Sequence, residues 1–262
     1  MSSIATRLQH TAGRAVLDSL AAVGRFAALM AELVRGLAEW RVWVPRAFDE
    51  AWNIGIGSLF IVLLISSFAG AVTALQAGYQ FTGSIPIYVV GSLVTESVVL
   101  ELGPVLVGLI LAGRIGASYA AELGTMRVTE QIDALESLGR SPASYLLVPR
   151  VVACLVMIPV LTVFADVVAV GAGWLASKQA LPITDADFVY GARIFWHPFD
   201  ATYSITKAFF FAAAIALISC YRGYTTKQGA EGVGRATTGA VVTSSVLFLL
   251  LDTLLAKLLL KP

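Results

Sequence analysis

The fold is decided by the stretch from Val89 to Gly113, which reads VVGSLVTESVVLELGPVLVGLILAG. It holds only two charged residues, Glu96 and Glu101, and Arg114 follows it directly. A helix rises about 1.5 Å per residue, so roughly 20 residues are needed to cross the hydrocarbon core of a bilayer. The stretch is long enough and therefore predicts a membrane-spanning helix.

The composition of the whole chain agrees with a membrane location. Of its 262 residues, 58% are hydrophobic and 13% are charged, whereas soluble domains average about 25% charged residues. The mean hydropathy is +0.81, and so little charge cannot cover a water-exposed surface. The net charge of +1 and the pI of about 7.8 leave no basic footprint, which excludes nucleic acid as an expected partner.

Further apolar runs repeat the pattern along the chain. No charged residue occurs between Glu50 and Glu96, and the turn-prone segment QAGYQFTGSIP at 76–86 divides this run. The expected spans cover approximately residues 52–75, 87–113, 151–177, 201–221 and 236–256. Small residues such as Ala112, Gly116 and Ala120 are spaced for close helix packing. We therefore expect an all-α membrane protein with about five transmembrane helices.

The basic residues indicate an orientation, because Lys and Arg are retained in short cytoplasmic loops. Three segments carry 13 of the 18 basic residues: the N-terminal stretch, the loop at 114–150 and the loop at 222–235. The other five are Lys178, Arg193, Lys207, Lys257 and Lys261. This distribution predicts a cytoplasmic N-terminus and an external C-terminus.

The segment before the first span has the pattern of an amphipathic helix. Its apolar positions recur at steps of three and four: Val16, Leu20, Val23, Phe26, Met30, Leu33 and Leu37. Trp40 and Trp43 are suited to anchor it at the membrane interface, just before Pro45. We expect residues 1–46 to form an interfacial region and residues 47–262 to form one transmembrane domain. Packing of this helix on a soluble partner is the alternative.

The sequence carries no recognisable catalytic or metal-binding motif. It has no GxxxxGK[ST] loop for ATP, no GxSxG elbow and no HExxH helix. His10 and His197 stand alone, and Cys154 and Cys220 lie inside apolar runs. We expect no catalytic residue, no metal site and no cofactor in this chain.

The loop at 114–150 contains a segment with two faces, TMRVTEQIDALESLGRSP. Its apolar positions follow the helical step: Val128, Ile132, Leu135 and Leu138. Gly139 and Pro142 then give a helix-stop signal. We expect a short amphipathic helix here, which either lies on its own bundle or enters a groove on another protein.

Five ionisable residues fall inside the expected spans, toward their external half: Glu96, Glu101, Asp166, Lys207 and Asp252. A charge at membrane depth costs a few kcal/mol on insertion scales, so such groups usually face a polar cavity and pair with each other. One amine among four carboxylates predicts an outward-leaning cavity where Lys207 pairs with Glu101 or meets a lipid phosphate. The alternative for Glu96, Lys207 and Asp252 is a position at the interface.

A resemblance adds to this interpretation. The segment ELGPVLVGLILAGRIGASYAAELGTMRVTEQIDALESLG, from Glu101 to Gly139, strongly resembles the MlaE family of ABC lipid-transport permeases, with its ELGP…AGR…AELGTM…EQIDAL signature. The segment GRATTGAVV, from Gly234 to Val242, resembles the start of that family's last helix. One departure is Leu100, because family members often carry Arg at that position.

The resemblance implies a homodimeric permease in a bacterial-type inner membrane. It would bind two copies of a separate ATPase, which holds the ATP, and MCE-type substrate-binding proteins on the outer face. The substrate would be a phospholipid or a related lipid. The segment from Glu122 to Leu138 would be the coupling helix, and its expected contact residues are Glu122, Met126, Arg127, Glu130, Ile132, Asp133, Leu135 and Leu138.

Two other classes of function compete with this one. The intramembrane carboxylates would also suit an ion- or proton-coupled secondary transporter, and a membrane scaffold without transport is the third class. Activity that needs ATP and a partner ATPase discriminates the permease from both. Dependence on a proton gradient would instead favour the secondary transporter.

The predicted topology can be tested by labelling single cysteines in intact cells with an impermeant thiol reagent. Cysteines at Ser84 and Lys261 are expected to react, because both positions are assigned to the external side. A cysteine at Ser141 is expected to stay unlabelled until the membrane is permeabilised. The reverse pattern would contradict the five-span topology.

Overall fold

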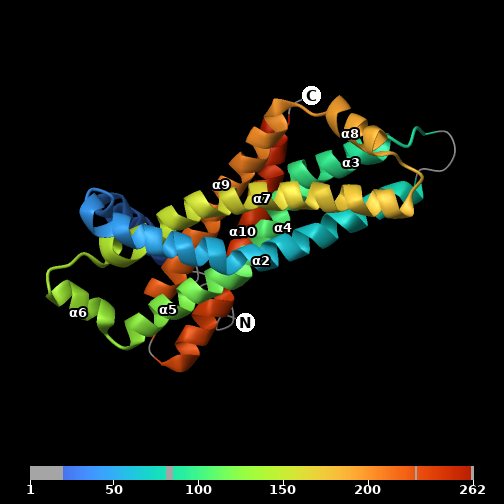
Figure 1. Cartoon of the computed structure of the whole chain (residues 1–262). Coiled ribbons are helices and arrows are strands. Elements are labelled where there is room, and N and C mark those ends of the chain that lie inside the picture. Colours follow the sequence, from blue (N-terminus) through green and yellow to red (C-terminus); the bar gives the residue numbers. More distant parts are fainter. Residues whose placement is uncertain (1–19, 81–84, 228, 261–262) are drawn as a thin grey trace, which may run out of the picture.

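The structure is a computed structural model that describes residues 20–80, 85–227 and 229–260. In this part of the chain it contains helices and no strand (Figure 1). Residues 20–36 are helical. The elements that follow are α2 (Trp40–Gln80), α3 (Val89–Ser97), η1 (Val98–Leu102), α4 (Gly103–Leu111), η2 (Ala112–Gly116), α5 (Ala117–Val128), α6 (Gln131–Ser137), η3 (Ala143–Leu147), α7 (Val148–Ala180), α8 (Asp185–Ile194), α9 (Pro198–Tyr224) and α10 (Ala230–Leu259).

Five helical units in the described residues are long and apolar enough to cross a membrane: 40–80, 89–128, 143–180, 198–224 and 230–259. The five predicted spans are therefore confirmed, and each helix continues beyond its apolar run. The first helix extends to Gln80, into the segment expected to be a turn. Ser84 and Lys261, chosen above for labelling, lie outside the described residues.

The helices α2 and α7 lie side by side along most of their length (Figure 1). Their backbones meet at Gly70, where an added Cβ would collide with the carbonyl group of Ala169. Gly173, one turn further along α7, would in turn bring a Cβ to 3.0 Å from the Gly70 carbonyl oxygen. Such contact without intervening side chains is typical of helix pairs in membranes, where packing drives association.

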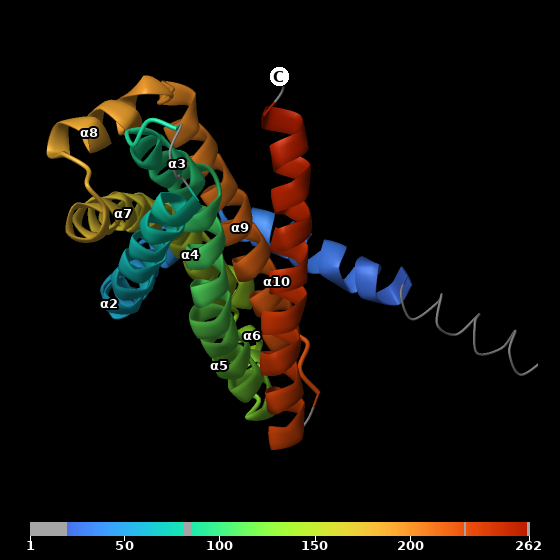
Figure 2. The same ribbon diagram turned by 90° about the vertical axis from the view of Figure 1, so that its right-hand side faces the viewer.

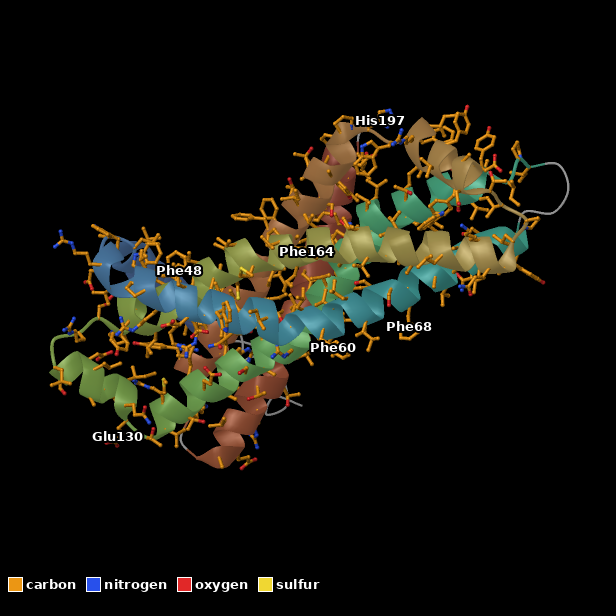
Figure 3. The ribbon with its side chains drawn as sticks, viewed as in Figure 1. Phe48, Phe60, Phe68, Glu130, Phe164 and His197 are labelled. Carbon is orange, nitrogen blue, oxygen red and sulfur yellow. The ribbon has the colours of Figure 1, made fainter. Side chains whose placement is uncertain are left out.

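Large apolar side chains cover the outer surface of this pair. Phe48, Phe60 and Phe68 on α2 and Phe164 on α7 are all more than half exposed and point away from the bundle (Figure 3). In water such a surface would be unfavourable, whereas in a bilayer it is in contact with lipid chains. The larger of two clusters of buried apolar side chains draws on several helices and includes Leu111, Ile158 and Ile215.

The last span, α10, stands at the edge of the bundle beside α9 (Figure 2). It contacts α9, α5 and η2, and the rings of Phe211 and Phe248 pack 5.0 Å apart between α9 and α10. Along its other side Val242, Val246 and Leu250 are exposed. One whole face of α10 is therefore uncovered by the described chain.

The helix at 20–36 lies against one end of the bundle. Leu29 and Leu33 are buried there, and the ring of Phe26 packs edge-on against Tyr221 at 5.4 Å. Leu20 and Val23 remain exposed, so only part of the predicted apolar face packs on the chain. Positions 1–19, which include Val16, lie outside the described residues. The Trp43 indole N–H donates to the Leu37 carbonyl at 3.0 Å and fixes the corner into α2.

The helix α8 was not expected from the sequence. It begins with a capping box, in which Thr184 and Asp187 each bond the other's backbone N–H. It packs on α3 at the opposite end of the molecule from α6 (Figure 1). Two glycines permit this contact, because a Cβ at Gly91 would collide with the Phe188 carbonyl of α8, and one at Gly191 with the carbonyl of Tyr88, just before α3. A hydrogen bond from Lys178 lowers the pKa of Asp185, in the first turn of α8.

The contact at Gly70 predicts opposite effects for two similar substitutions. Gly70→Ala would force the backbones of α2 and α7 apart and is expected to destabilise the protein by about 1–3 kcal/mol. Gly171→Ala, on α7 with open space around it, is expected to be neutral or to stabilise by up to about 1 kcal/mol, because alanine is the better helix former. The midpoint of thermal unfolding in detergent measures both. Equal midpoints for the two variants would contradict the close packing.

Candidate functional site

A buried amine lies at the centre of the bundle. The side chain of Lys207 on α9 is 0% exposed, and its Nζ donates to Glu101 Oε2 at 2.7 Å. The same Nζ lies 2.5 Å from Asp252 Oδ1 on α10. The predicted pair of Glu101 and Lys207 is thus present, and the structure adds Asp252 to it. Three helical units meet at this one ammonium group.

The third partner of Lys207 is the backbone carbonyl of Leu100, four residues before Pro104. In an α-helix the carbonyl of Leu100 would accept from the N–H of residue 104, but Pro104 has none. Lys207 Nζ donates to this oxygen at 3.0 Å instead. The preceding turn is π-helical, from Val98 to Leu102, and carries Glu101. The ELGP segment therefore supplies both a carboxylate and a backbone carbonyl to the same cation.

Asp166 does not join this cluster. Its Oδ2 accepts from Ser204 at 2.9 Å, and its Oδ1 lies against Gly103, where any Cβ would collide with it. Asp166 faces a cavity of about 340 Å³ with largely apolar walls that include Val99 and Val167. Glu96 is half-buried on α3 and forms no ion pair within the described residues. Of the five predicted intramembrane charges, three come together and two stay apart.

The expected single helix from Glu122 to Leu138 is wrong, because the chain turns within it. The helix α5 ends at Val128, and Glu130 adopts a left-handed conformation with φ of 59° before α6 begins (Figure 3 labels Glu130). Arg127 Nη1 donates to Asp133 Oδ1 at 2.6 Å across this turn. We call residues 117–138 the α5–α6 elbow.

The apolar side of the elbow packs mainly on its own bundle, which is one of the two alternatives that its sequence left open. Ile132 is 0% exposed, and Met126 and Leu135 pack partly against the same core. Leu138 is 76% exposed and is the free apolar side chain at the end of α6. Glu122 is about half exposed but is also tied to the bundle, since its Oε2 accepts from Arg150 at 3.0 Å.

The elbow is joined to the C-terminal end of α9. Tyr224 Oη donates to Glu136 Oε1 at 3.3 Å, and the Arg127 guanidinium lies over the Tyr224 ring at 5.8 Å. Next to it Gly223 contacts α5, where a Cβ would lie 3.0 Å from the carbonyl oxygen of Ala120. Tyr224 and Lys207 lie on the same helix, roughly 25 Å apart along its axis. The elbow and the charged cluster are therefore joined by one continuous helix, α9.

A second polar network was missed by the sequence analysis. Arg150, whose side chain is 7% exposed, lies between Glu50 on α2 and Glu122 on α5, at 3.5 and 3.0 Å. Tyr119 Oη donates to Glu50 Oε2 at 3.2 Å. Arg150 seemed to mark the end of a loop, but the apolar residues on both sides of it were the sign that it is buried. Within the described residues no group of three metal-ligating side chains occurs.

These features define a class of protein. Five apolar spans, a buried charge cluster within them and a polar elbow tied to one span describe a multi-pass membrane protein. The comparison with known proteins specifies the class further. The family Permease MlaE matches residues 47–258, and the chain belongs to this family.

Curated relatives agree with that assignment. A probable ABC transporter permease protein of Rickettsia prowazekii (strain Madrid E) is 37% identical over 255 residues, which are 97% of this chain and 98% of the relative. A probable ABC transporter permease protein of Synechocystis is 38% identical over 208 residues, 79% of each chain. The Arabidopsis thaliana chloroplast protein TRIGALACTOSYLDIACYLGLYCEROL 1 is 35% identical over 224 residues, 86% of this chain and 63% of the relative. The chain is an ABC transporter permease, a class whose ATPase is a partner subunit.

The charged cluster predicts a strong coupling between Lys207 and Asp252. Lys207→Met leaves the Asp252 carboxylate buried without a cation, which is expected to cost about 3–5 kcal/mol of stability. Adding Asp252→Asn removes that unpaired charge. The double variant is therefore expected to be about 0.5–3 kcal/mol more stable than the sum of the two single-variant losses would predict. Thermal or denaturant unfolding of the purified variants measures the coupling. Lys257→Met, an exposed control on α10, is expected to change little, and strict additivity would show that the two residues act independently.

Proposed function

We propose that this chain is the permease subunit that moves phospholipids or related lipids, as a homodimer, between a bacterial-type inner membrane and an external MCE-type binding protein. Its N-terminus lies in the cytoplasm, and two copies of a separate ATPase bind the α5–α6 elbow. The observation that carries the proposal is the direct connection of the elbow to α9, because α9 also holds Lys207. Closure of an ATPase pair on the elbow would shift α9 and with it the charged cluster.

The character of the cavities supports a lipid as the substrate. The cavity at Asp166 combines apolar walls with a single carboxylate and the Ser204 hydroxyl, which suits an amphiphile better than an ion. The half-exposed side chain of Glu101 leads from the buried Lys207 to the surface. The name of the chloroplast relative is that of a galactolipid, trigalactosyldiacylglycerol. In the proposed homodimer, the second copy of the chain packs on the exposed face of α10.

In this proposal the ATPase binds the exposed side of the α5–α6 elbow, at the C-terminal end of α6. Since Ile132 and Leu135 pack inward, the exposed Leu138 at the tip of α6 is the apolar side chain left for a partner. The exposed acidic residues beside it, Asp133 and Glu136, are held by Arg127 and Tyr224. This arrangement fixes the tip of α6 relative to α9, so that a partner bound there acts on the span.

The proposal predicts ATP-driven lipid movement in a reconstituted system. Vesicles that hold the permease, its ATPase and a fluorescent phospholipid are expected to transfer the lipid to an MCE acceptor when ATP is hydrolysed. Leu138→Asp would bury a charge at the docking surface and is expected to weaken ATPase binding by a factor on the order of 100 or more, whereas Leu138→Met should retain it. Co-purification of the ATPase measures this step.

Two outcomes would count against the proposal. Lipid transfer that follows a proton gradient and ignores ATP would identify a secondary transporter instead. Full ATPase binding and full transport by Leu138→Asp would show that the elbow is not the docking surface.

A further inference from the structure

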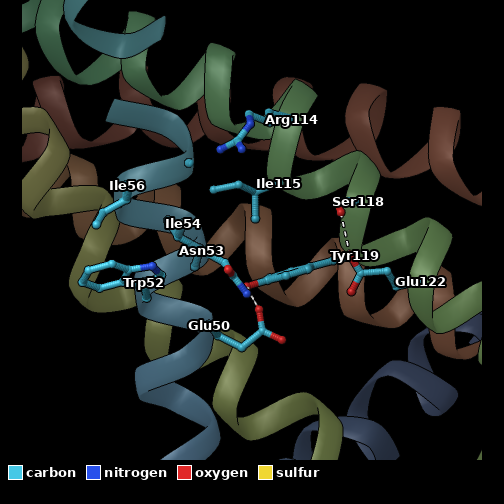
Figure 4. Close-up of a pocket in the computed structure, with 11 residues that line it drawn as sticks. Glu50, Trp52, Asn53, Ile54, Ile56, Arg114, Ile115, Ser118, Tyr119 and Glu122 are labelled. Carbon is cyan, nitrogen blue, oxygen red and sulfur yellow. Dashed lines mark hydrogen bonds between the residues drawn. The ribbon is translucent and has the colours of Figure 1, made fainter. Parts of the chain in front are cut away.

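A polar pocket of about 520 Å³ lies between α2 and the η2–α5 segment, away from the Lys207 cluster. Its polar lining residues include Glu50, Asn53, Arg114, Ser118, Tyr119 and Glu122 (Figure 4). Glu50 is the last charged residue before the uncharged run to Glu96, and Arg114 ends the second apolar run. The pocket therefore lies where the hydrocarbon core meets the lipid headgroups.

One end of the pocket is positive. Arg114 points into it from η2, donates one hydrogen bond to Ser58 Oγ and forms no ion pair within the described residues. Gly57 leaves the space for it, since a Cβ there would lie 2.6 Å from Arg114 Nη2. A guanidinium has five N–H donors in a planar fork that matches the oxygens of a phosphate. Most of these donors remain available at Arg114.

The other end of the pocket is negative. Glu50 and Glu122 share the single cation Arg150, so one negative charge is left over. The Glu122 side chain is 47% exposed and accepts from Ser118 at 2.7 Å through Oε1. In Figure 4, Arg114 lies at one end of the pocket, Glu50 and Glu122 lie toward the other, and Ile115 and Asn53 stand between them. The pocket thus has separated charges of opposite sign.

An apolar groove of about 340 Å³ adjoins this pocket and shares Trp52 and Ile56 with it. Its other walls come from α2 and α7, including Leu59, Met157 and Phe164. A ligand with a dipolar head in the pocket could lay its acyl chain in this groove. The polar pocket and the apolar groove thus place a polar and an apolar surface side by side, as the two parts of an amphiphile require.

We infer that this pocket binds the zwitterionic headgroup of a glycerophospholipid in the cytoplasmic leaflet, with its phosphate on Arg114 and its primary ammonium on Glu50 and Glu122. The inference rests on the proposed function, for which the pocket is the lateral entry or exit of the lipid. The three charged side chains that line the pocket, Arg114, Glu50 and Glu122, sum to zero only together with Arg150, which pairs with both carboxylates. A headgroup that also has no net charge but has separated charges complements this arrangement. A headgroup with a net negative charge is attracted by Arg114 but repelled by the carboxylates of Glu50 and Glu122.

Binding to the purified full-length chain tests the inference without ATP or an ATPase. Native mass spectrometry with dioleoylphosphatidylethanolamine or dioleoylphosphatidylglycerol gives the apparent Kd for each lipid. The wild type is expected to prefer phosphatidylethanolamine. Arg114→Gln is expected to raise the apparent Kd of both lipids by about tenfold or more, because both carry the phosphate that Arg114 binds. Glu122→Gln is expected to weaken the binding of phosphatidylethanolamine alone, which brings the Kd values of the two lipids closer together.

Arg41→Gln is the matched control, since Arg41 is an exposed cation stacked on Trp40 and lies outside the pocket. It is expected to keep both affinities. Equal Kd values for the two lipids in the wild type, or an unchanged Kd in Arg114→Gln and Glu122→Gln, would overturn the inference. If ATP-driven transfer is present but this preference is absent, only the headgroup site fails. If the preference is present without ATP-driven transfer, only the proposed function fails.

Discussion

The packing of three spans depends on the ammonium group of Lys207. An amine at membrane depth must find partners inside the protein, because lipid offers none. Glu101, Asp252 and the Leu100 carbonyl surround it, and they come from the second and the fifth spans, while the lysine itself is on the fourth. These contacts fix the height at which the three spans meet. A slip of any span by one turn, about 5.4 Å, would leave a charge without its partner.

Hydrophobicity and the cost of buried charge predicted much of this arrangement. The five spans followed from apolar runs alone, and the pair of Glu101 and Lys207 followed from the need of an isolated charge for a partner. The participation of Asp252 in the Lys207 cluster could not be predicted, since it depends on how α10 packs against α9. Asp166 stays apart because Gly103 admits its carboxylate beside the π-helical turn, which is a local packing detail.

Two other differences have equally local causes. The turn at Glu130 has no glycine or proline to mark it, and the apolar steps continue across it, so the periodicity suggested one helix. Periodicity also cannot tell whether an apolar face contacts its own bundle or a partner, and Ile132 proved to face its own bundle. The capping box of α8 was visible as Thr184 and Asp187, but the helix is short and only its packing on α3 shows its place.

The pairing of Lys207 with Asp252 has a consequence for biosynthesis. The two residues lie on successive spans, and Lys207 leaves the ribosome before Asp252 does. The fourth span therefore enters the membrane with Glu101 already present as its counter-ion, whereas the last span brings a carboxylate whose cation must already be in place. Integration of α10 is thus easiest at the side of α9, where Lys207 already supplies the cation for Asp252. The order of the charges along the chain matches the order in which the bundle can be assembled.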